Sequence, residues 1–343
     1  MKKIVLIIDC PQASSSKKWV YRELALTGLP IDVVDCKHVI SHIEQRGAWG
    51  KLIARWITFC QCIKAMKHSK KGDVVFCWSQ WSGLLFNMLP GAKTRKIISY
   101  NWLTPVPNSK TRFLYANALQ NKNLVIVINL EENRDIIAKS YQVEKSSRML
   151  YIPDVFDDSE QFEKPFHIKD NRYCFSGGRA NRDWKLFCRL AELNTQIRFE
   201  AVANRADWDD ELPVPSNVSL HFDIPAEEYY ALLRGAYLAI YPLKENKVSG
   251  LVNIVKASQM GKIVLTTRLP VTQMYYPISH KEYLLEVGKV DDWCREIQKV
   301  YAYTEEEYNV YVQAVQQHIQ RNFSPEMAGQ ILREQIRKWE KGE

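Results

Sequence analysis

Two glycine-bearing segments about seventy residues apart carry residue types that suit phosphate binding. Residues 175–184 read Phe-Ser-Gly-Gly-Arg-Ala-Asn-Arg-Asp-Trp, and residues 249–267 begin Ser-Gly-Leu-Val-Asn. Each segment ties a small-residue turn to a strand-like run and a helix-like run. A helix that begins after such a turn directs backbone N–H groups and its positive dipole end toward one point. The sequence therefore predicts a nucleotide-diphosphate site built from both segments.

Basic residues strengthen the first segment. Arg179, Arg182 and Lys185 follow Gly178 closely, and guanidinium is a better bidentate partner for phosphate than ammonium. The alternative interpretation is a solvated basic turn in which Asp183 caps the following helix. In the second segment, the backbone N–H groups at the start of the predicted helix complete the anion site, and they belong to Ser249, Gly250, Leu251 and Val252.

The two segments also resemble a known family. The pattern Ser-Gly, six residues, Ala-x-x-x-Gly-Lys-x-Val-x-x-Thr is similar to the nucleotide-sugar site of GT-B glycosyltransferases of the group 1 (family 4) kind. The segment Ser-Gly-Gly-Arg-x-x-Arg-Asp-Trp resembles the glycine-arginine strand end of that family. The resemblance covers residues 170–335 well and the first half of the chain in outline.

The resemblance implies a hexosyltransferase-like enzyme that uses a nucleotide-diphosphate sugar as donor, retains the anomeric configuration and needs neither a cofactor nor a metal. It implies that Arg179 and a second basic residue contact the donor diphosphate. Spacing allows Arg182 or Lys185 as the second, and Arg182 is preferred because it precedes the helix. It also implies that Asp223 and Ile224 line the nucleobase pocket, with an N-capped helix in front of an apolar strand as the alternative.

The chain departs from the family pattern at several positions. The family commonly carries two glutamates eight residues apart, and here those positions hold Val248 and Lys256. Lys256 cannot accept hydrogen bonds from ribose hydroxyls but can meet a phosphate. Glu245 is the nearest upstream acid for the donor sugar. Asn101 stands where many relatives have a His that touches the reacting sugar, and an Asn can hydrogen-bond but cannot act as a base.

The elements expected to position these residues form two series of apolar strands alternating with amphipathic helices. This alternation predicts an α/β protein with two Rossmann-like, doubly wound domains that face each other across a cleft, the GT-B arrangement. The expected boundaries are an N-terminal acceptor-binding domain over 1–152, a linker over 153–170, a nucleotide-sugar-binding domain over 171–323, and a last helix over 324–343 that crosses back to the first domain.

The composition narrows the class of protein. The 343 residues are 46% hydrophobic and 25% charged, as expected for a globular chain. The sequence contains no run of 18 apolar residues, so no membrane-spanning helix is expected. The first residues do not resemble a signal sequence, so a cytoplasmic location is expected. If the chain contacts a membrane, the expected place is the inner face of the plasma membrane. The eight cysteines include no Cys-x-x-Cys pair, and buried reduced thiols are expected rather than a metal site.

The positive charge is concentrated in the first half. Residues 1–160 contain 23 Lys and Arg against 14 Asp and Glu, a net of +9, whereas the rest carries −1. No nucleic-acid-binding motif accompanies this charge, so an anionic membrane surface or a lipid-phosphate acceptor is preferred over DNA or RNA. Residues 49–71 mix aromatic, aliphatic and basic residues at helical spacing. That pattern fits either a helix lying in a membrane interface or a core helix with a basic end.

Together these observations favour a glycosyltransferase that moves a sugar to a cell-envelope glycan or a lipid-linked acceptor. Two alternatives stay open. A catalytically silent GT-B protein that binds a glycan or a partner would explain the missing glutamates and Asn101. A basic nucleic-acid binder would explain the charge of the first half.

Overall fold

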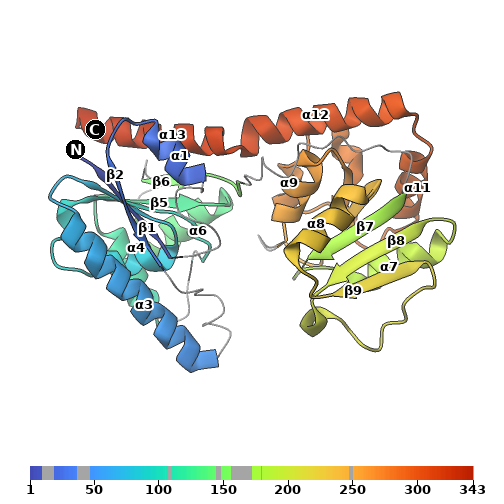
Figure 1. Cartoon of the computed structure of the whole chain (residues 1–343), viewed down its shortest axis with the longest axis horizontal. Coiled ribbons are helices and arrows are strands. Elements are labelled where there is room, and N and C mark those ends of the chain that lie inside the picture. Colours follow the sequence, from blue (N-terminus) through green and yellow to red (C-terminus); the bar gives the residue numbers. More distant parts are fainter. Residues whose placement is uncertain are drawn as a thin grey trace. The chain divides into compact units, whose positions relative to one another are not determined.

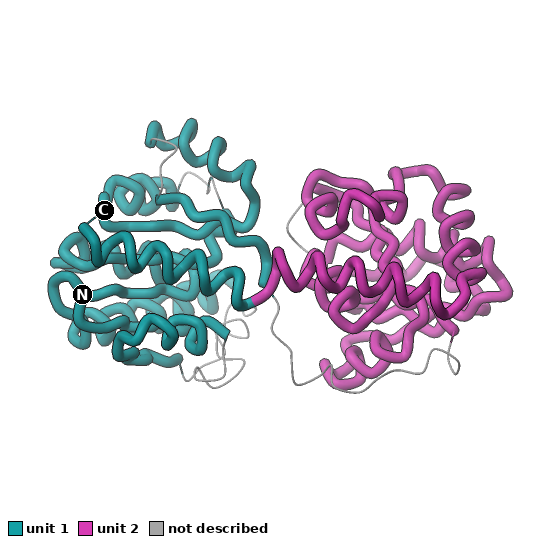
Figure 2. The backbone as a smooth tube through the Cα atoms, turned by 90° about the horizontal axis from the view of Figure 1, so that it is seen from above, with its two compact units in different colours: residues 1–157, 325–343 teal, residues 158–324 magenta. Residues whose placement is uncertain are grey.

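The computed structural model describes residues 1–9, 19–36, 47–104, 106, 110–143, 148–155, 172–178, 180–246 and 250–342. The chain forms two compact units (Figure 2). Unit 1 consists of residues 1–157 and 325–343, and unit 2 consists of residues 158–324. Most of the linker predicted over 153–170 lies outside the described residues.

Unit 1 is built on a parallel sheet of six strands in the order β2-β1-β3-β4-β5-β6 (Figure 1). The inner strands are short apolar runs with almost no exposed surface, as expected for a parallel sheet covered on both faces, and the edge strands β2 and β6 are only partly buried. Their bounds are β1 Ile4–Ile8, β2 Ile31–Asp35, β3 Val74–Cys77, β4 Lys96–Ser99, β5 Leu124–Ile128 and β6 Met149–Tyr151.

Helices cover both faces of this sheet. One hydrophobic core joins β1, through Val5 and Ile7, to α3, α4, α5 and α6, and a second core joins β1, through Ile4 and Leu6, to α1 and α13. The helices of the unit are α1 Trp19–Ala25, α3 Gly47–His68, α4 Gln80–Asn87, the 3-10 turn η2 Ala92–Thr94, α5 Arg112–Leu119, α6 Glu132–Tyr141 and α13 Pro325–Lys341.

The last helix returns to the first unit. Helix α13 packs along α1. Gly329 allows the close approach, because a Cβ at that position would overlap the Glu23 side chain. Arg333 donates to the largely buried Glu23 carboxylate and to the Glu23 carbonyl oxygen. A glycine and a buried ion pair therefore hold the two ends of the chain together.

Unit 2 repeats the architecture with a parallel sheet in the order β12-β11-β10-β7-β8-β9. The strands are β7 Tyr173–Gly178, β8 Arg198–Ala203, β9 Val218–Phe222, β10 Leu238–Tyr241, β11 Ile263–Thr267 and β12 Leu284–Leu285. The helices are α7 Trp184–Leu193, η4 Arg205–Asp207, α8 Ala226–Gly235, α9 Val252–Gln259, α10 Pro270–Gln273, η5 Ile278–Tyr283, α11 Val290–Tyr301 and α12 Glu305–Phe323.

The strand order of each sheet creates one position that favours ligand binding. In unit 2 the chain runs outward from β7 to β8 and β9, then crosses back to place β10 on the other side of β7. In unit 1 the same reversal occurs between β1 and β3. Ligands of open parallel sheets bind outside the carboxyl ends of the strands at such reversals, because the two loops there diverge and leave a crevice.

The predicted α/β fold class is confirmed, with two six-stranded parallel sheets flanked by helices. Strand β7 extends to Gly178, so the glycine pair stands where the strand ends and the following turn begins.

Candidate functional site

The candidate site lies at the carboxyl edge of the unit 2 sheet, where the strand order reverses. Strand β7 ends at Gly178, and the loops after β7 and β10 meet there. The two loops are joined by a bridge between Arg182 and Leu243, and by a hydrogen bond of 2.8 Å from Asp183 N to Pro242 O. Both glycine segments singled out in the sequence therefore reach one place in the fold.

Arg182 is the central charge of this place. Its side chain is only 3% exposed. Nε donates to Gly177 O at 3.1 Å and Nη2 donates to Gly250 O at 3.2 Å, so one guanidinium connects the two glycine turns. The guanidinium carbon also lies 4.8 Å from the centre of the Tyr241 ring, a cation–π contact.

No acid compensates the charge of Arg182 among the described residues. It forms no ion pair there, and its Nη1 is buried without a hydrogen-bond partner. Burial accordingly lowers the pKa of Arg182, while the nearby Tyr229 and Tyr241 oppose the shift. A buried cation that lacks an anion is costly, and such sites are a common sign of a binding function. The geometry can accept an anion beside the glycine turns.

The two glycines are required by this arrangement. Gly178 has φ +146° and Gly250 has φ +92°. A Cβ on Gly250 would lie 2.5 Å from Arg182 Nη1, and a Cβ on Gly178 would lie 2.9 Å from Nη2. A side chain at either position would therefore push against the guanidinium.

Helix α9 begins directly beside the buried guanidinium. Leu251 is its N-cap residue and has a buried side chain, whereas Val252 is exposed at the first helical position. The side chain of Arg179 and the backbone N–H group of Ser249 were predicted to take part, but both residues lie outside the described part of the chain. Among the described residues, Gly250 and the start of α9 lie next to Arg182.

Asn253 is a site residue that the sequence analysis did not single out. Its Nδ2 donates to Gly177 O at 3.1 Å, and it lies about as close to a Cβ on Gly178 as Arg182 does. It occupies the second position of α9, one turn before Lys256, and that spacing to a predicted site residue is the signal that could have found it.

Lys256 is held by an aromatic side chain of α8. Its Nζ donates to the hydroxyl of Tyr230 and lies 4.3 Å from the centre of the Tyr230 ring. Because Lys256 follows Asn253 by three residues, it lies on the same face of α9. The structure thus holds the predicted Lys256 against α8, through the ring and the hydroxyl of Tyr230.

Glu245 is fastened to the loop by its backbone. Glu245 N donates to Asn181 Oδ1 and Asn181 Nδ2 donates back to Glu245 O, both at 2.9 Å. Asn181 has φ +61°, a conformation that Asn tolerates better than most residues. Glu245 lies in the loop after β10, next to the loop after β7. Its side chain is exposed.

Lys185, which the spacing allows as an alternative to Arg182 for the second basic residue at the diphosphate, lies on the exposed side of α7. Its side chain is 76% exposed on the outer face of α7 and lies 3.8 Å from Asp209. The inner face of α7 is formed by Trp184, Phe187 and Cys188, which turns Lys185 toward solvent. The alternative prediction for Asp183 is confirmed, because its carboxylate caps α7 by accepting from Leu186 N at 3.0 Å.

Asp223 and Ile224 lie in the loop between β9 and α8, at the same edge of the sheet. Asp223 has φ +48°, and its carboxylate accepts from Arg205 N at 3.2 Å. The Arg205 guanidinium lies over the ring of Phe222 at 4.7 Å. Arg205 therefore contacts both the loop, at Asp223, and the end of β9, at Phe222.

Asn101 belongs to unit 1, where it lies in the loop after β4, at the carboxyl edge of the sheet. It follows β4 with φ +51°, and its Nδ2 donates to Trp78 O at 3.3 Å. Nearby, Ser79 caps α4 and donates to the carboxylate of Asp9, a residue that sequence reasoning did not single out although it directly follows β1. Burial raises the pKa of Asp9, and one of its oxygens has no partner among the described residues.

Two further observations concern the described residues only. No group of three or more His, Cys, Asp or Glu side chains in these ranges is arranged to hold a metal ion. None of the helices within them combines the length and apolar character needed to cross a membrane.

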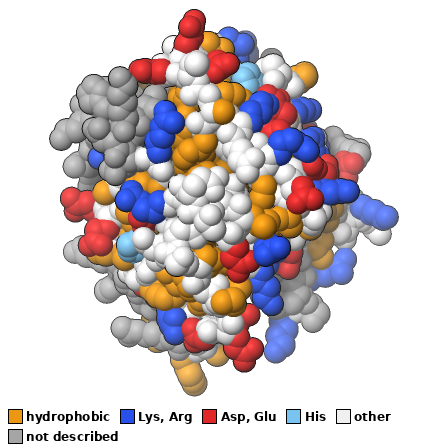
Figure 3. All heavy atoms as spheres, turned by 90° about the vertical axis from the view of Figure 1, so that its right-hand side faces the viewer, with side chains coloured by type: hydrophobic (Ala, Val, Ile, Leu, Met, Phe, Trp, Pro, Cys, Tyr) orange, Lys and Arg blue, Asp and Glu red, His pale blue; other side chains and the backbone are white. Residues whose placement is uncertain are grey.

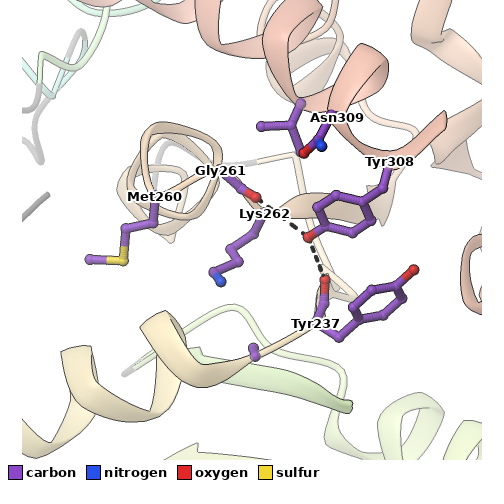
Figure 4. Close-up of a pocket in the computed structure, with 8 residues that line it drawn as sticks. Tyr237, Met260, Gly261, Lys262, Tyr308 and Asn309 are labelled. Atoms are coloured by element: carbon purple, nitrogen blue, oxygen red, sulfur yellow. Dashed lines mark hydrogen bonds between the residues drawn. The ribbon is translucent and has the colours of Figure 1, made fainter. Parts of the chain in front are cut away.

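A separate pocket of about 180 Å³ lies at the opposite edge of the unit 2 sheet, next to the amino ends of β10 and β11. Tyr308 donates to Tyr237 O at 2.7 Å on one side of it, and Lys262 extends from the start of β11 (Figure 4). Lys262 is 3% exposed, and burial, aided by the charge of Arg234, lowers its pKa to about 7.

Replacing Lys262 by Met is expected to stabilise unit 2 at neutral and acidic pH. An unfolded lysine keeps its proton up to its ordinary pKa of 10.5, whereas the folded one releases it near 7. The wild-type protein should therefore gain stability as pH rises between these values, and Lys262→Met should remove that slope. At one pKa unit per 1.36 kcal/mol, the gain below pH 7 is about 2–4 kcal/mol once lost contacts are subtracted. Urea unfolding across this pH range measures it, and equal slopes in both proteins would contradict it.

Comparison with known proteins gives a match in structure but not in sequence. No protein-family model and no curated protein matches the chain. Among solved structures, sucrose-phosphate synthase from Thermosynechococcus elongatus aligns over all of both chains with a TM-score of 0.68 and 13% identity. Trehalose-6-phosphate synthase from E. coli, bound to UDP-2-fluoro glucose, aligns over 96% of this chain and 98% of its own with a TM-score of 0.69 and 9% identity.

A third solved structure extends the pattern. Anabaena HepE in complex with UDP and glucose has a TM-score of 0.64 and 13% identity, and the alignment covers 98% of this chain and all of that one. These proteins are similar to the present chain along nearly its whole length, which identifies the fold at identities too low to identify an activity. The chain shares the α/β fold of these solved structures, the GT-B fold.

Proposed function

We propose that this protein is a glycosyltransferase that moves a sugar, hexosyl in kind, from a nucleotide-diphosphate donor, with retention and without a metal or other cofactor. One observation carries the proposal. The guanidinium of Arg182 is buried under the Gly178 and Gly250 turns, at the strand reversal of unit 2, and no acid among the described residues pairs with it. A diphosphate is an anion of the size and charge that such a place can bind.

The proposed chemistry is electrostatic. The donor diphosphate lies against the Gly250 turn, so that the N–H groups at the start of α9 and the charges of Arg179, Arg182 and Lys256 stabilise the negative charge that develops on the leaving group. Arg182 acts from beneath the turns, as a positioning residue and a fixed charge. The first contact with phosphate oxygens is assigned to Arg179, as the sequence pattern implies.

The remaining roles are proposed from the resemblance. The loop at Asp223 and Ile224 holds the base, Glu245 faces the donor sugar, and Asn101 of unit 1 hydrogen-bonds the reacting sugar. The acceptor is a cell-envelope glycan or a lipid-linked glycan, met at the inner face of the plasma membrane. The names of the solved relatives support UDP as the first nucleotide to test.

A thermal-shift screen with UDP, GDP, ADP and CMP, followed by matching nucleotide sugars, tests the donor site. A nucleotide present at a hundred times its dissociation constant should stabilise the protein by about 2.7 kcal/mol. Stabilisation by a diphosphate but not by CMP supports the proposal. No shift with any nucleotide would overturn it in favour of the silent glycan- or partner-binding protein, and nucleotide binding without any sugar release would point to the same alternative.

Replacing Arg179 by Ala is expected to weaken donor binding and turnover while leaving the unfolding midpoint unchanged. A charged hydrogen bond to phosphate contributes about 1.5–3 kcal/mol, so the affinity should fall about ten- to a hundredfold. The matched control is Arg189→Ala, which removes an exposed guanidinium on α7 that pairs only with Glu192 among the described contacts. Wild-type donor affinity in Arg179→Ala would remove Arg179 from the site.

A further inference from the structure

The first half of α3 carries an apolar face that the fold leaves exposed. Trp49 is 79% exposed, Leu52 62%, Ile53 49% and Trp56 65%. These four residues, called here the α3 stripe, recur every three or four positions and so occupy one side of the helix. Single exposed apolar residues are common on proteins, but a contiguous group that includes two tryptophans marks an interaction surface.

The second half of the same helix is ordinary. From Thr58 onward α3 alternates exposed lysines with buried residues such as Gln61, Cys62 and Ala65, which face the core of unit 1. The residues buried in the first half are small, Gly50 and Ala54, so there the helix rests on the unit by its small side and directs its large apolar side outward. The second half of α3 therefore fits a core helix with a basic end, whereas the first half leaves its large apolar side chains exposed.

The stripe borders a shallow groove. The groove has a volume of about 490 Å³ and is lined almost entirely by apolar side chains of α3, together with Leu85 of α4. The Arg55 guanidinium at its side stacks on Trp81 at 3.9 Å, and Trp56 packs against Phe59. Side chains that already pack on one another lose little further freedom when a partner binds them.

The charge of α3 has one sign. The 22 residues of the helix include Lys51, Arg55, Lys64 and Lys67 and no Asp or Glu. On the face of the molecule in Figure 3, by contrast, basic and acidic side chains are interspersed. Lys51 lies within the stripe's own turn and is exposed. An apolar stripe with tryptophans and a purely basic background is the composition of helices that lie in the interface of anionic bilayers.

We propose that the α3 stripe inserts into the interface of an anionic lipid bilayer and holds unit 1 on the membrane surface. The tryptophans lie at headgroup level, Leu52 and Ile53 reach the acyl boundary, and Lys51 meets lipid phosphates. A second copy of the chain is a weaker fit, because an isologous contact would bring the lysines of one α3 toward those of the other. The docking does not depend on the donor site being active.

The test is co-sedimentation of the full chain with vesicles of phosphatidylcholine alone and of phosphatidylcholine mixed with phosphatidylglycerol. Binding to the anionic vesicles, reduced by high salt, is expected for the wild type. The variant Trp49→Ser/Trp56→Ser should lower the partition coefficient at least tenfold. The matched control is Leu26→Ser/Ile278→Ser, which removes two apolar side chains that are equally exposed outside the stripe and should leave binding unchanged.

Charge is tested separately. Lys51→Glu should weaken binding to anionic vesicles about fivefold or more, from about 1 kcal/mol per basic residue near the surface. Lys93→Glu makes the same charge change at another exposed position of unit 1 and should have a smaller effect. Equal losses for both lysine variants would reduce the interaction to net charge and overturn the assignment to the stripe.

Two other outcomes would also overturn the proposal. A wild-type dimer in light scattering that becomes monomeric in Trp49→Ser/Trp56→Ser would assign the stripe to self-association. A lack of vesicle binding together with no change in acrylamide quenching between the wild type and the double variant would show that the chain itself covers the stripe. Vesicle co-sedimentation, light scattering and acrylamide quenching are all measured without a nucleotide. An inactive donor site would therefore leave these measurements unaffected.

Discussion

Replacing Arg182 by Met is expected to leave the stability of the ligand-free protein nearly unchanged and to weaken nucleoside-diphosphate binding about a hundredfold. The variant lacks the two charged hydrogen bonds that the guanidinium donates to Gly177 O and Gly250 O, which contribute about 1.5–3 kcal/mol each. The substitution also removes a buried charge that lacks an acid, which costs several kcal/mol in the wild type. Because these terms are of similar size and opposite sign, we expect a net change below about 1.5 kcal/mol.

The free energy of ligand binding contains no such opposing terms. A diphosphate beside Gly250 interacts with the full charge of Arg182 at low dielectric, and Met has no charge to replace this interaction. Urea unfolding of the ligand-free protein and calorimetric titration with UDP, or with the nucleotide that stabilises best, measure the two effects. Arg189→Met on the exposed face of α7 is the control. A purely structural Arg182 would show the reverse, a loss of more than about 3 kcal/mol in stability with unchanged affinity.

Replacing Gly250 by Ala is expected to destabilise unit 2 and to abolish most of the stabilisation by nucleotide. The residue has φ +92°, which costs about 1–2 kcal/mol for any residue with a Cβ. The new Cβ would also lie 2.5 Å from Arg182 Nη1 and 3.3 Å from Ala180 O, so the guanidinium must leave its place. The same movement disturbs the N–H groups that would face the diphosphate.

Gly288 provides the control for this variant. It has φ +77° and no atom within 4 Å of the position of a Cβ, so Gly288→Ala introduces backbone strain without a clash. We expect both variants to lower the unfolding midpoint and only Gly250→Ala to lose the nucleotide-dependent rise. If both variants keep that rise, the Gly250 turn does not contact the ligand.

Much of the fold followed from local patterns. Most strands of both sheets are short, largely apolar runs, and burial on both faces removes the need for alternation, so their position could be seen without any tertiary information. The alternation with helices implies parallel sheets, because a parallel connection needs a crossover. The cap of α7 by Asp183 is likewise a local feature, since its partner is only three residues away.

The roles of neighbouring basic residues could not be separated by spacing. Arg182 and Lys185 both follow the glycine pair, yet one is buried between two turns and the other pairs with Asp209 in solvent. Helical periodicity offered part of the answer, because Trp184 and Phe187 fix the inner face of α7 and so turn Lys185 outward. No sequence pattern near Arg182 predicts its contact with Gly250, because Gly250 is 68 residues away in the chain.

The sequence by itself determined which runs become strands and helices, how many sheets form, and that two glycine turns with basic residues lie at the ends of strands. Those properties depend on apolar periodicity and on backbone freedom, which act over a few residues. The tertiary structure alone decided that Arg182 is buried with no acid beside it in the described part of the chain, that Asn253 contacts the same glycine pair, and that the large apolar side chains of the first half of α3 stay exposed. Each of these depends on which distant elements pack together, and burial is a property of that packing and not of any single segment.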